Sequence, residues 1–119
     1  MTDHRELLLV EDEAFIAIET EMALEESGQG PVKVCANVSE AEAYLADRIP
    51  RAVLLDFNLG KGRTSEEFAS ELIKREIPFA FLTGYTQATL QLPAELLKAP
   101  RFSKPCHVDD VVSWLTSLR

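Results

Sequence analysis

Hydrophobic residues follow two patterns along this chain. Short unbroken apolar runs alternate with longer segments in which apolar residues recur every three or four positions. The short runs predict buried strands, and the longer segments predict amphipathic helices. The predicted strands cover residues 7–10, 32–36, 51–56, 78–83 and 101–103. The predicted helices cover residues 13–27, a short segment that follows Ser39 and ends before Pro50, residues 64–76 and residues 107–118.

The alternation of strands and helices predicts the fold class. A strand, a crossover helix and a second parallel strand form a right-handed unit that places the helix on one face of the sheet. Five such units predict an α/β domain with three layers, a doubly wound (βα)5 fold around a parallel five-stranded sheet. Between residues 85 and 99, Pro93 interrupts any helix, so we expect a short or irregular fourth helix there. One domain over residues 1–119, without an output domain, is the expected organisation.

The helix boundaries are predicted from apolar spacing and capping residues. In the first helix, apolar residues at helical spacing indicate the buried side and glutamates indicate the outward side, and Gly28 follows as the C-terminal glycine. Pairs of a hydroxyl residue and a glutamate three positions later predict capping boxes. The apolar set is Ala14, Phe15, Ala17, Ile18 and Met22; the predicted boxes are Ser39 with Glu42 and Thr64 with Glu67.

Composition excludes several classes of partner. The net charge of −8 disfavours binding to nucleic acid, which requires a basic face. No stretch approaches the roughly 18 apolar residues of a membrane span, and residues 1–6 lack the pattern of a signal peptide. Cys35 lies inside a predicted strand, so Cys35 and Cys106 are expected to be buried free thiols and not a disulfide. These features predict a cytoplasmic protein with no nucleic-acid or membrane partner.

Polar residues stand where the predicted strands end. Glu11 and Asp12 follow the first strand, Asp56 ends the third, Thr83 ends the fourth and Lys104 follows the fifth. Each has an ordinary structural explanation as a helix cap, a turn or a solvated loop residue. All carboxyl ends of a parallel sheet lie at one edge, however, and that edge is where such folds bind ligands. Clustered carboxylates require a cation, and oxygen ligands favour Mg²⁺ over zinc.

These residues, in this order and spacing, resemble the response-regulator receiver domains of two-component signalling over essentially the whole chain. The resemblance implies a flavodoxin-like sheet and identifies Asp56, in the run Val53 to Asp56, as the acceptor of a phosphoryl group. The donor would be the phosphohistidine of a histidine kinase or phosphotransfer protein, and the recipient of the signal a downstream protein target. The Lys104-Pro105 pair belongs to the same pattern.

The resemblance also implies a role for each site residue. Mg²⁺ would be held by Asp12, Asp56 and the backbone carbonyl of Asn58, with Glu11 assisting through water. Thr83 and Lys104 would bind the phosphoryl oxygens, and movement of Thr83 would operate the switch. These roles agree with the residue types, because phosphoryl transfer requires positioning and charge neutralisation.

The chain departs from the commonest receiver pattern near that switch. Arg101 stands where receivers usually carry an aromatic residue, so the usual aromatic switch is in doubt, and Phe102 beside it is expected to face the core. With Gly84 after Thr83, the run Phe81 to Gly84 resembles the Phe-Ala-Thr-Gly motif of a subgroup of receivers, although Leu82 replaces the alanine. Trp114 in the last helix could anchor the core or contact a partner, and the core position is favoured.

Three other functions agree with part of this pattern. Haloacid-dehalogenase-type phosphatases share an aspartate nucleophile after a buried strand, but they need an acid two residues later, where this chain has Asn58. The protein is therefore not expected to be an enzyme, apart from its own phosphorylation and slow dephosphorylation. A receiver-like binding module that works without phosphorylation and a phosphate sink are the remaining alternatives.

Overall fold

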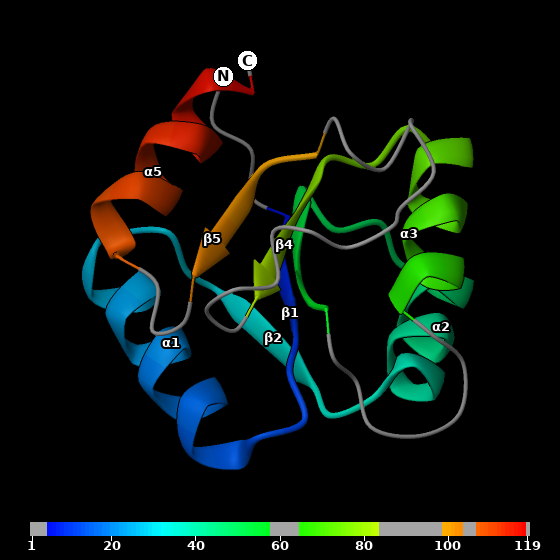
Figure 1. Ribbon diagram of the computed structural model, residues 1–119, viewed down its shortest axis with the longest axis horizontal. Coiled ribbons are helices and arrows are strands. Elements are labelled where there is room, and N and C mark those ends of the chain that lie inside the picture. Colours follow the sequence, from blue (N-terminus) through cyan, green and yellow to red (C-terminus); the bar gives the residue numbers. More distant parts are fainter. Residues whose placement is uncertain (1–4, 58–64, 84–98, 104–106, 119) are drawn as a thin grey trace.

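The computed structural model describes residues 5–57, 65–83, 99–103 and 107–118. Five parallel strands form one sheet in the order β2-β1-β3-β4-β5 (Figure 1). The strands are β1 (Leu7–Val10), β2 (Val32–Cys35), β3 (Ala52–Asp56), β4 (Phe79–Thr83) and β5 (Arg101–Ser103). The described helices are α1 (Ala14–Glu26), α2 (Val38–Asp47), α3 (Ser65–Lys74) and α5 (Val108–Ser117). The predicted flavodoxin-like α/β fold is confirmed.

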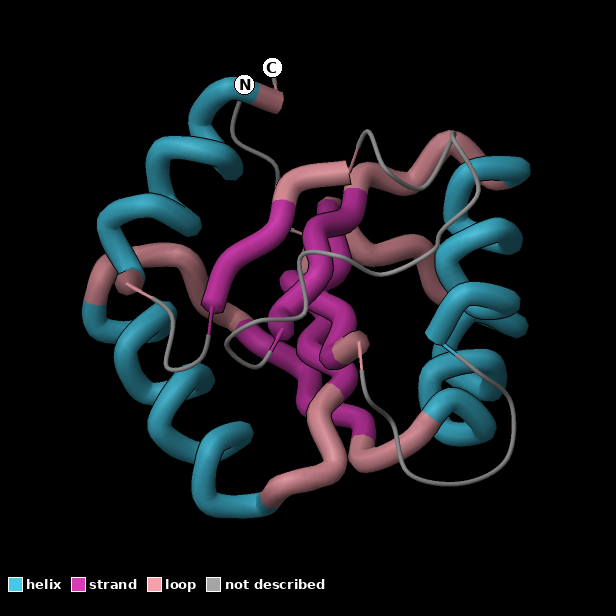
Figure 2. The backbone as a smooth tube through the Cα atoms, viewed as in Figure 1, coloured by secondary structure: helices cyan, strands magenta, loops and turns pink. Residues whose placement is uncertain are grey.

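Helices cover both faces of the sheet. Figure 2 shows the strands in the middle, with α1 and α5 on one side and α2 and α3 on the other. Successive strand residues point to opposite faces, so Leu8, Val53 and Phe81 belong to the core beneath α2 and α3. Leu9 and Leu54 belong to the core beneath α1 and α5. The central strands β1 and β3 are buried on both faces, which explains why the sequence forms continuous apolar runs there. No helix in the described part of the chain is long and apolar enough to cross a membrane.

Of the five residues predicted to form the buried side of α1, Ala17 alone is buried, and the prediction is wrong for the other four. Phe15 is 73% exposed, and Ile18 and Met22 are also exposed, whereas Ala17 and Leu24 are buried with Thr20. The two stripes lie two residues apart along the helix, which places them about 200° apart around its axis. Because both stripes have helical spacing, periodicity alone does not choose between them. The smaller residues of the buried stripe lie against the sheet.

Two helix ends show how the turns are closed. After α1, Gly28 has a φ of 85°, and the N–H groups of Gly28 and Gln29 donate to the carbonyls of Glu25 and Leu24, as predicted for a C-terminal glycine. After α3, the same pair of hydrogen bonds forms around Glu76, which has a φ of 58°. A glutamate therefore takes the left-handed conformation that usually favours glycine.

The cap predicted for α2 is wrong by two residues. Asn37 is the N-cap, and its side chain accepts a hydrogen bond of 2.9 Å from the N–H of Glu40. Glu40 in turn accepts one of 2.9 Å from the N–H of Ala36. The pair Asn37 and Glu40 has the same three-residue spacing as Ser39 and Glu42, and asparagine is an equally good cap.

Other predictions near the helices have separate outcomes. Phe102 and Trp114 are half-buried against the core, with ring centroids 6.1 Å apart, as expected. Leu118 follows the end of α5 and is exposed. Cys35 is a buried free thiol, as predicted. Thr64, Cys106 and the segment predicted to form the fourth helix, except Ala99, lie outside the described residues.

Candidate functional site

The register of the sheet brings two acids to one edge. Val10 pairs with Leu55 in the parallel ladder between β1 and β3. The next residue of each strand is an acid, Glu11 after β1 and Asp56 at the end of β3. The N–H of Glu11 also donates to the carbonyl of Cys35 at 3.0 Å, which holds Glu11 at the end of β2. The strand order reverses between β1 and β3, and ligands bind at such a switch point in open α/β sheets.

Three carboxylates form a cluster at this edge. Glu11, Asp12 and Asp56 each offer an oxygen, and these oxygens all lie within 4.8 Å of one another. Glu11 and Asp56 are each only 1% exposed, whereas Asp12 is exposed. Like charges at this separation repel one another strongly where water is excluded. The donor set, three carboxylates with one open to solvent, fits a hard divalent cation such as Mg²⁺.

The acids are held by the elements that follow them. Oε2 of Glu11 accepts a hydrogen bond of 3.1 Å from the N–H of Glu13, the N-cap residue of α1. This bond directs the Glu11 side chain back over the start of α1. Glu11 therefore both accepts a hydrogen bond at the start of α1 and contributes an oxygen to the acidic cluster.

Ser65 is a buried residue of this site that the sequence did not reveal. It is the first residue of α3, and its hydroxyl lies 2.7 Å from the carbonyl oxygen of Asp56 and 2.8 Å from that of Phe57. Thr64, the neighbouring hydroxyl residue, was predicted to begin this helix. The only sequence signal was a second hydroxyl residue at the helix start, and local spacing could not show that it reaches back to β3.

The remaining predicted site residues lie at the border of the described chain. Thr83 is the last residue of β4 and follows Leu82, which pairs with Asp56. Its backbone therefore ends at the same edge as the acids, as predicted. Its side chain lies outside the described part of the structure, as do Asn58 and Lys104.

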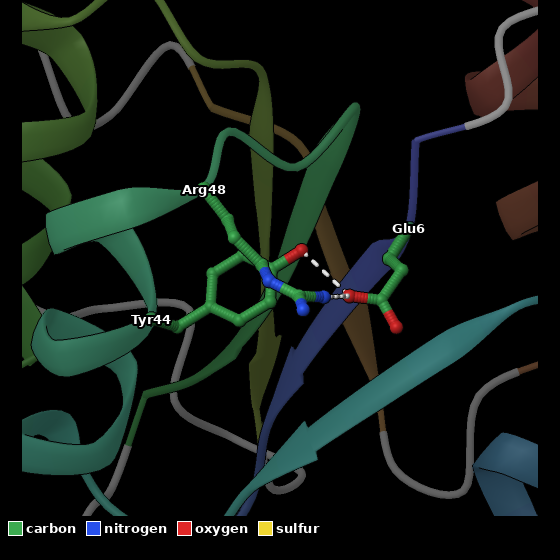
Figure 3. Close-up of polar contacts among 3 residues, drawn as sticks. All are labelled: Glu6, Tyr44 and Arg48. Atoms are coloured by element: carbon green, nitrogen blue, oxygen red, sulfur yellow. Dashed lines mark hydrogen bonds and ion pairs between the residues drawn. The ribbon is translucent and has the colours of Figure 1, made fainter.

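A second polar cluster lies at the opposite end of β1. The carboxylate of Glu6 accepts a hydrogen bond of 2.9 Å from the hydroxyl of Tyr44 and a charged one of 3.3 Å from Arg48 (Figure 3). Burial and the hydrogen bond to Glu6 raise the pKa of Tyr44 to about 12. A hollow of about 730 Å³ adjoins these residues, away from the acidic edge. The contacts fasten α2 to the start of β1, which is a structural role.

Comparison with known proteins agrees with this architecture. No protein-family model matches the chain. The phyllosphere-induced regulator PhyR of Methylorubrum extorquens is 30% identical over 114 residues, which are 91% of this chain and 42% of that protein. The solution structure of SdrG from Sphingomonas melonis is 34% identical, covers 99% of this chain and 98% of SdrG, and has a TM-score of 0.79. The receiver domain of NtrX from Brucella abortus shares the fold at 24% identity and a TM-score of 0.83, over 96% of this chain and all of that one.

The chain belongs to the response-regulator receiver domains. Receiver domains act as phosphoacceptors in signalling, and the cluster of Glu11, Asp12 and Asp56 is compatible with the phosphorylation site. The chain spans less than half the length of PhyR.

Proposed function

We propose that this receiver domain accepts a phosphoryl group on Asp56 from the phosphohistidine of a histidine kinase or phosphotransfer protein. The observation that carries the proposal is the burial of Asp56 beside Glu11 and Asp12 at the carboxyl edge of the sheet. A carboxylate there is fixed by its strand, while exposed Asp12 leaves one side of the cluster open to solvent. Phosphoryl transfer requires an acceptor that is held in place.

The transfer step needs little chemistry from the protein. A carboxylate oxygen of Asp56 bonds to phosphorus, the bond from phosphorus to the histidine nitrogen breaks, and that nitrogen keeps the electron pair and takes a proton. The product is an acyl phosphate on Asp56. Mg²⁺ held by Glu11, Asp12 and Asp56 would neutralise charge on the phosphoryl oxygens. From the resemblance, we assign the carbonyl of Asn58 to the same cation, and Thr83 and Lys104 to the phosphoryl oxygens.

The output would be a changed surface for a downstream protein target, with no turnover of an external substrate. The solution structure of the BeF3-activated conformation of SdrG from Pseudomonas melonis is 34% identical to this chain. It has a TM-score of 0.78 and covers 99% of this chain and 98% of SdrG. A beryllofluoride resembles a phosphoryl group in shape and charge, which supports a similar response here. The buried thiol of Cys35 suits a reducing compartment, so we place the exchange in the cytoplasm.

Intact-protein mass spectrometry tests the proposal. The protein is incubated with acetyl phosphate and Mg²⁺, beside a sample with a chelator and an Asp56→Asn variant. We expect the mass of one phosphoryl group to be added only to the wild type and only with Mg²⁺. An unmodified wild type, with both acetyl phosphate and a panel of phosphorylated kinases, would favour a binding module that works without phosphorylation.

A further inference from the structure

We propose that Ser65 is a positioning residue for the phosphoryl acceptor. Its hydroxyl holds the backbone of Asp56 and Phe57, so that the acceptor carboxylate stays in register with Glu11. The proposal rests on the proposed function of Asp56 and adds a residue to it.

Ser65 occupies a buried position within the fold and not a position on the surface. Ser65 is 3% exposed, and its oxygen is within hydrogen-bond distance of two consecutive carbonyl oxygens, those of Asp56 and Phe57. A serine hydroxyl has one proton, so the two carbonyls share one donor. The contact ties the first residue of α3 to the last residue of β3 across the loop that connects them.

The other groups around this backbone are also fixed. The N–H of Phe57 donates to the carbonyl of Leu82 at 2.8 Å, which extends the ladder between β3 and β4 past Asp56. The ring of Phe57 meets that of Phe81 edge-on, with centroids 5.4 Å apart. The sheet therefore holds the amide side of the peptide that joins Asp56 and Phe57, and Ser65 holds its carbonyl side. Removal of the hydroxyl would release one of these two constraints.

A release of this kind should affect chemistry more than folding. The direction of the Asp56 side chain follows from the orientation of its own backbone, and misplacement by about 1 Å can slow a reaction on the order of a hundredfold. The same displacement would change the distance to Glu11, and hence the affinity of the cluster for a cation. A purely structural serine would lower stability without either effect.

The test compares variants of Ser65 with deletions remote from the acids. Ser65→Ala removes the hydroxyl, Ser65→Thr keeps it, and Ser65→Cys nearly keeps the size with a weak donor. Ile77→Val and Leu45→Ala are the control variants. Both lower stability from buried sites near the opposite ends of the strands, one by less and one by more than the loss of stability expected for Ser65→Ala. Each folded variant is assayed for its phosphorylation rate with acetyl phosphate and, by calorimetry, for its Mg²⁺ dissociation constant.

We expect Ser65→Ala to be phosphorylated at least about tenfold more slowly and to bind Mg²⁺ several-fold more weakly than the wild type. Ser65→Thr should recover most of both, and the two remote deletions should stay within about twofold of the wild type. If Ser65→Ala does not fold, Ser65→Cys should show the same losses. A rate and affinity within twofold of the wild type in the hydroxyl-free variant would overturn the role of Ser65. A wild type that is never phosphorylated would instead contradict the proposed function.

Discussion

Glu11 and Asp56 follow paired residues of adjacent strands, and both carboxylates are buried with oxygens less than 4.8 Å apart. Backbone pairing, not side-chain attraction, creates this proximity, because Val10 and Leu55 are fixed partners in the ladder. The fold therefore brings together like charges, which repel one another, at its carboxyl edge. A cation or a phosphoryl group with its cation would relieve that repulsion.

Neutralisation of one acid should stabilise the cation-free protein. We expect Asp56→Asn to raise the free energy of unfolding by about 1–3 kcal/mol in the presence of a chelator, from the lost repulsion with Glu11 and Asp12. The measurement is urea denaturation at low ionic strength. Glu19→Gln, an exposed control on α1, should change stability by less than about 0.5 kcal/mol. Equal stability of Asp56→Asn and the wild type would show that the carboxylates do not repel significantly.

The end of α3 offers a stabilising substitution. Glu76 has a φ of 58°, where its Cβ is strained, and glycine carries no such strain. Glu76→Gly should increase stability by about 0.5–1 kcal/mol, after the entropy that glycine gains in the unfolded chain is subtracted. Thermal denaturation by circular dichroism measures the change.

Gly28→Ala is the matched control for that turn. Gly28 has a φ of 85° and nothing lies within 4 Å of an added Cβ, so only backbone strain opposes alanine. We expect a loss of about 1 kcal/mol. If both substitutions shifted the melting temperature in the same direction, the argument from left-handed conformation would be wrong.

Tyr44 should make stability depend on pH in alkaline solution. Its pKa rises from an ordinary 10 to about 12 in the folded protein, first through burial and then through its hydrogen bond to Glu6. The folded state thus binds the phenolic proton more tightly than the unfolded state. The contribution is complete below pH 10 and is lost as the pH rises towards 12. Tyr44→Phe should remove this loss and cost about 1 kcal/mol at neutral pH.

Arg48 provides the contrast in the same cluster. Its side chain is 64% exposed, and exposed ion pairs contribute little. Arg48→Ala should therefore change stability at neutral pH by less than about 0.5 kcal/mol. A larger loss than that of Tyr44→Phe in chemical denaturation would show that the charge, and not the phenol, fastens α2 to β1.

The two stripes of α1 should respond differently to truncation. Leu24 is fully buried, so Leu24→Ala should cost about 2–5 kcal/mol, whereas Phe15→Ala at an exposed site should cost less than about 0.5 kcal/mol. Equilibrium denaturation of the two variants measures the difference. Similar losses would mean that the stripe with Phe15 is buried in solution.

The fold could be predicted because each strand and helix follows from a local pattern, and the acidic cluster could be predicted because the carboxyl ends of parallel strands meet at one edge of the sheet. Residues 7–10 are apolar without a break, and acids follow them directly, so this one stretch predicts both a buried strand and part of the site. The buried side of α1 could not be predicted, because two apolar stripes have the same period. The contacts of Ser65 with Asp56 and of Tyr44 with Glu6 join elements distant in sequence, and no local spacing indicates them.

The most direct test of the central claim identifies the residue that carries the phosphoryl group. An acyl phosphate on aspartate is reduced by borohydride to homoserine, which peptide sequencing by mass spectrometry locates. After incubation with acetyl phosphate and Mg²⁺, we predict homoserine at position 56 alone, and none when the donor is omitted. Homoserine at position 12, or a labelled protein with an unchanged residue 56, would contradict the assignment of Asp56 as the phosphoryl acceptor.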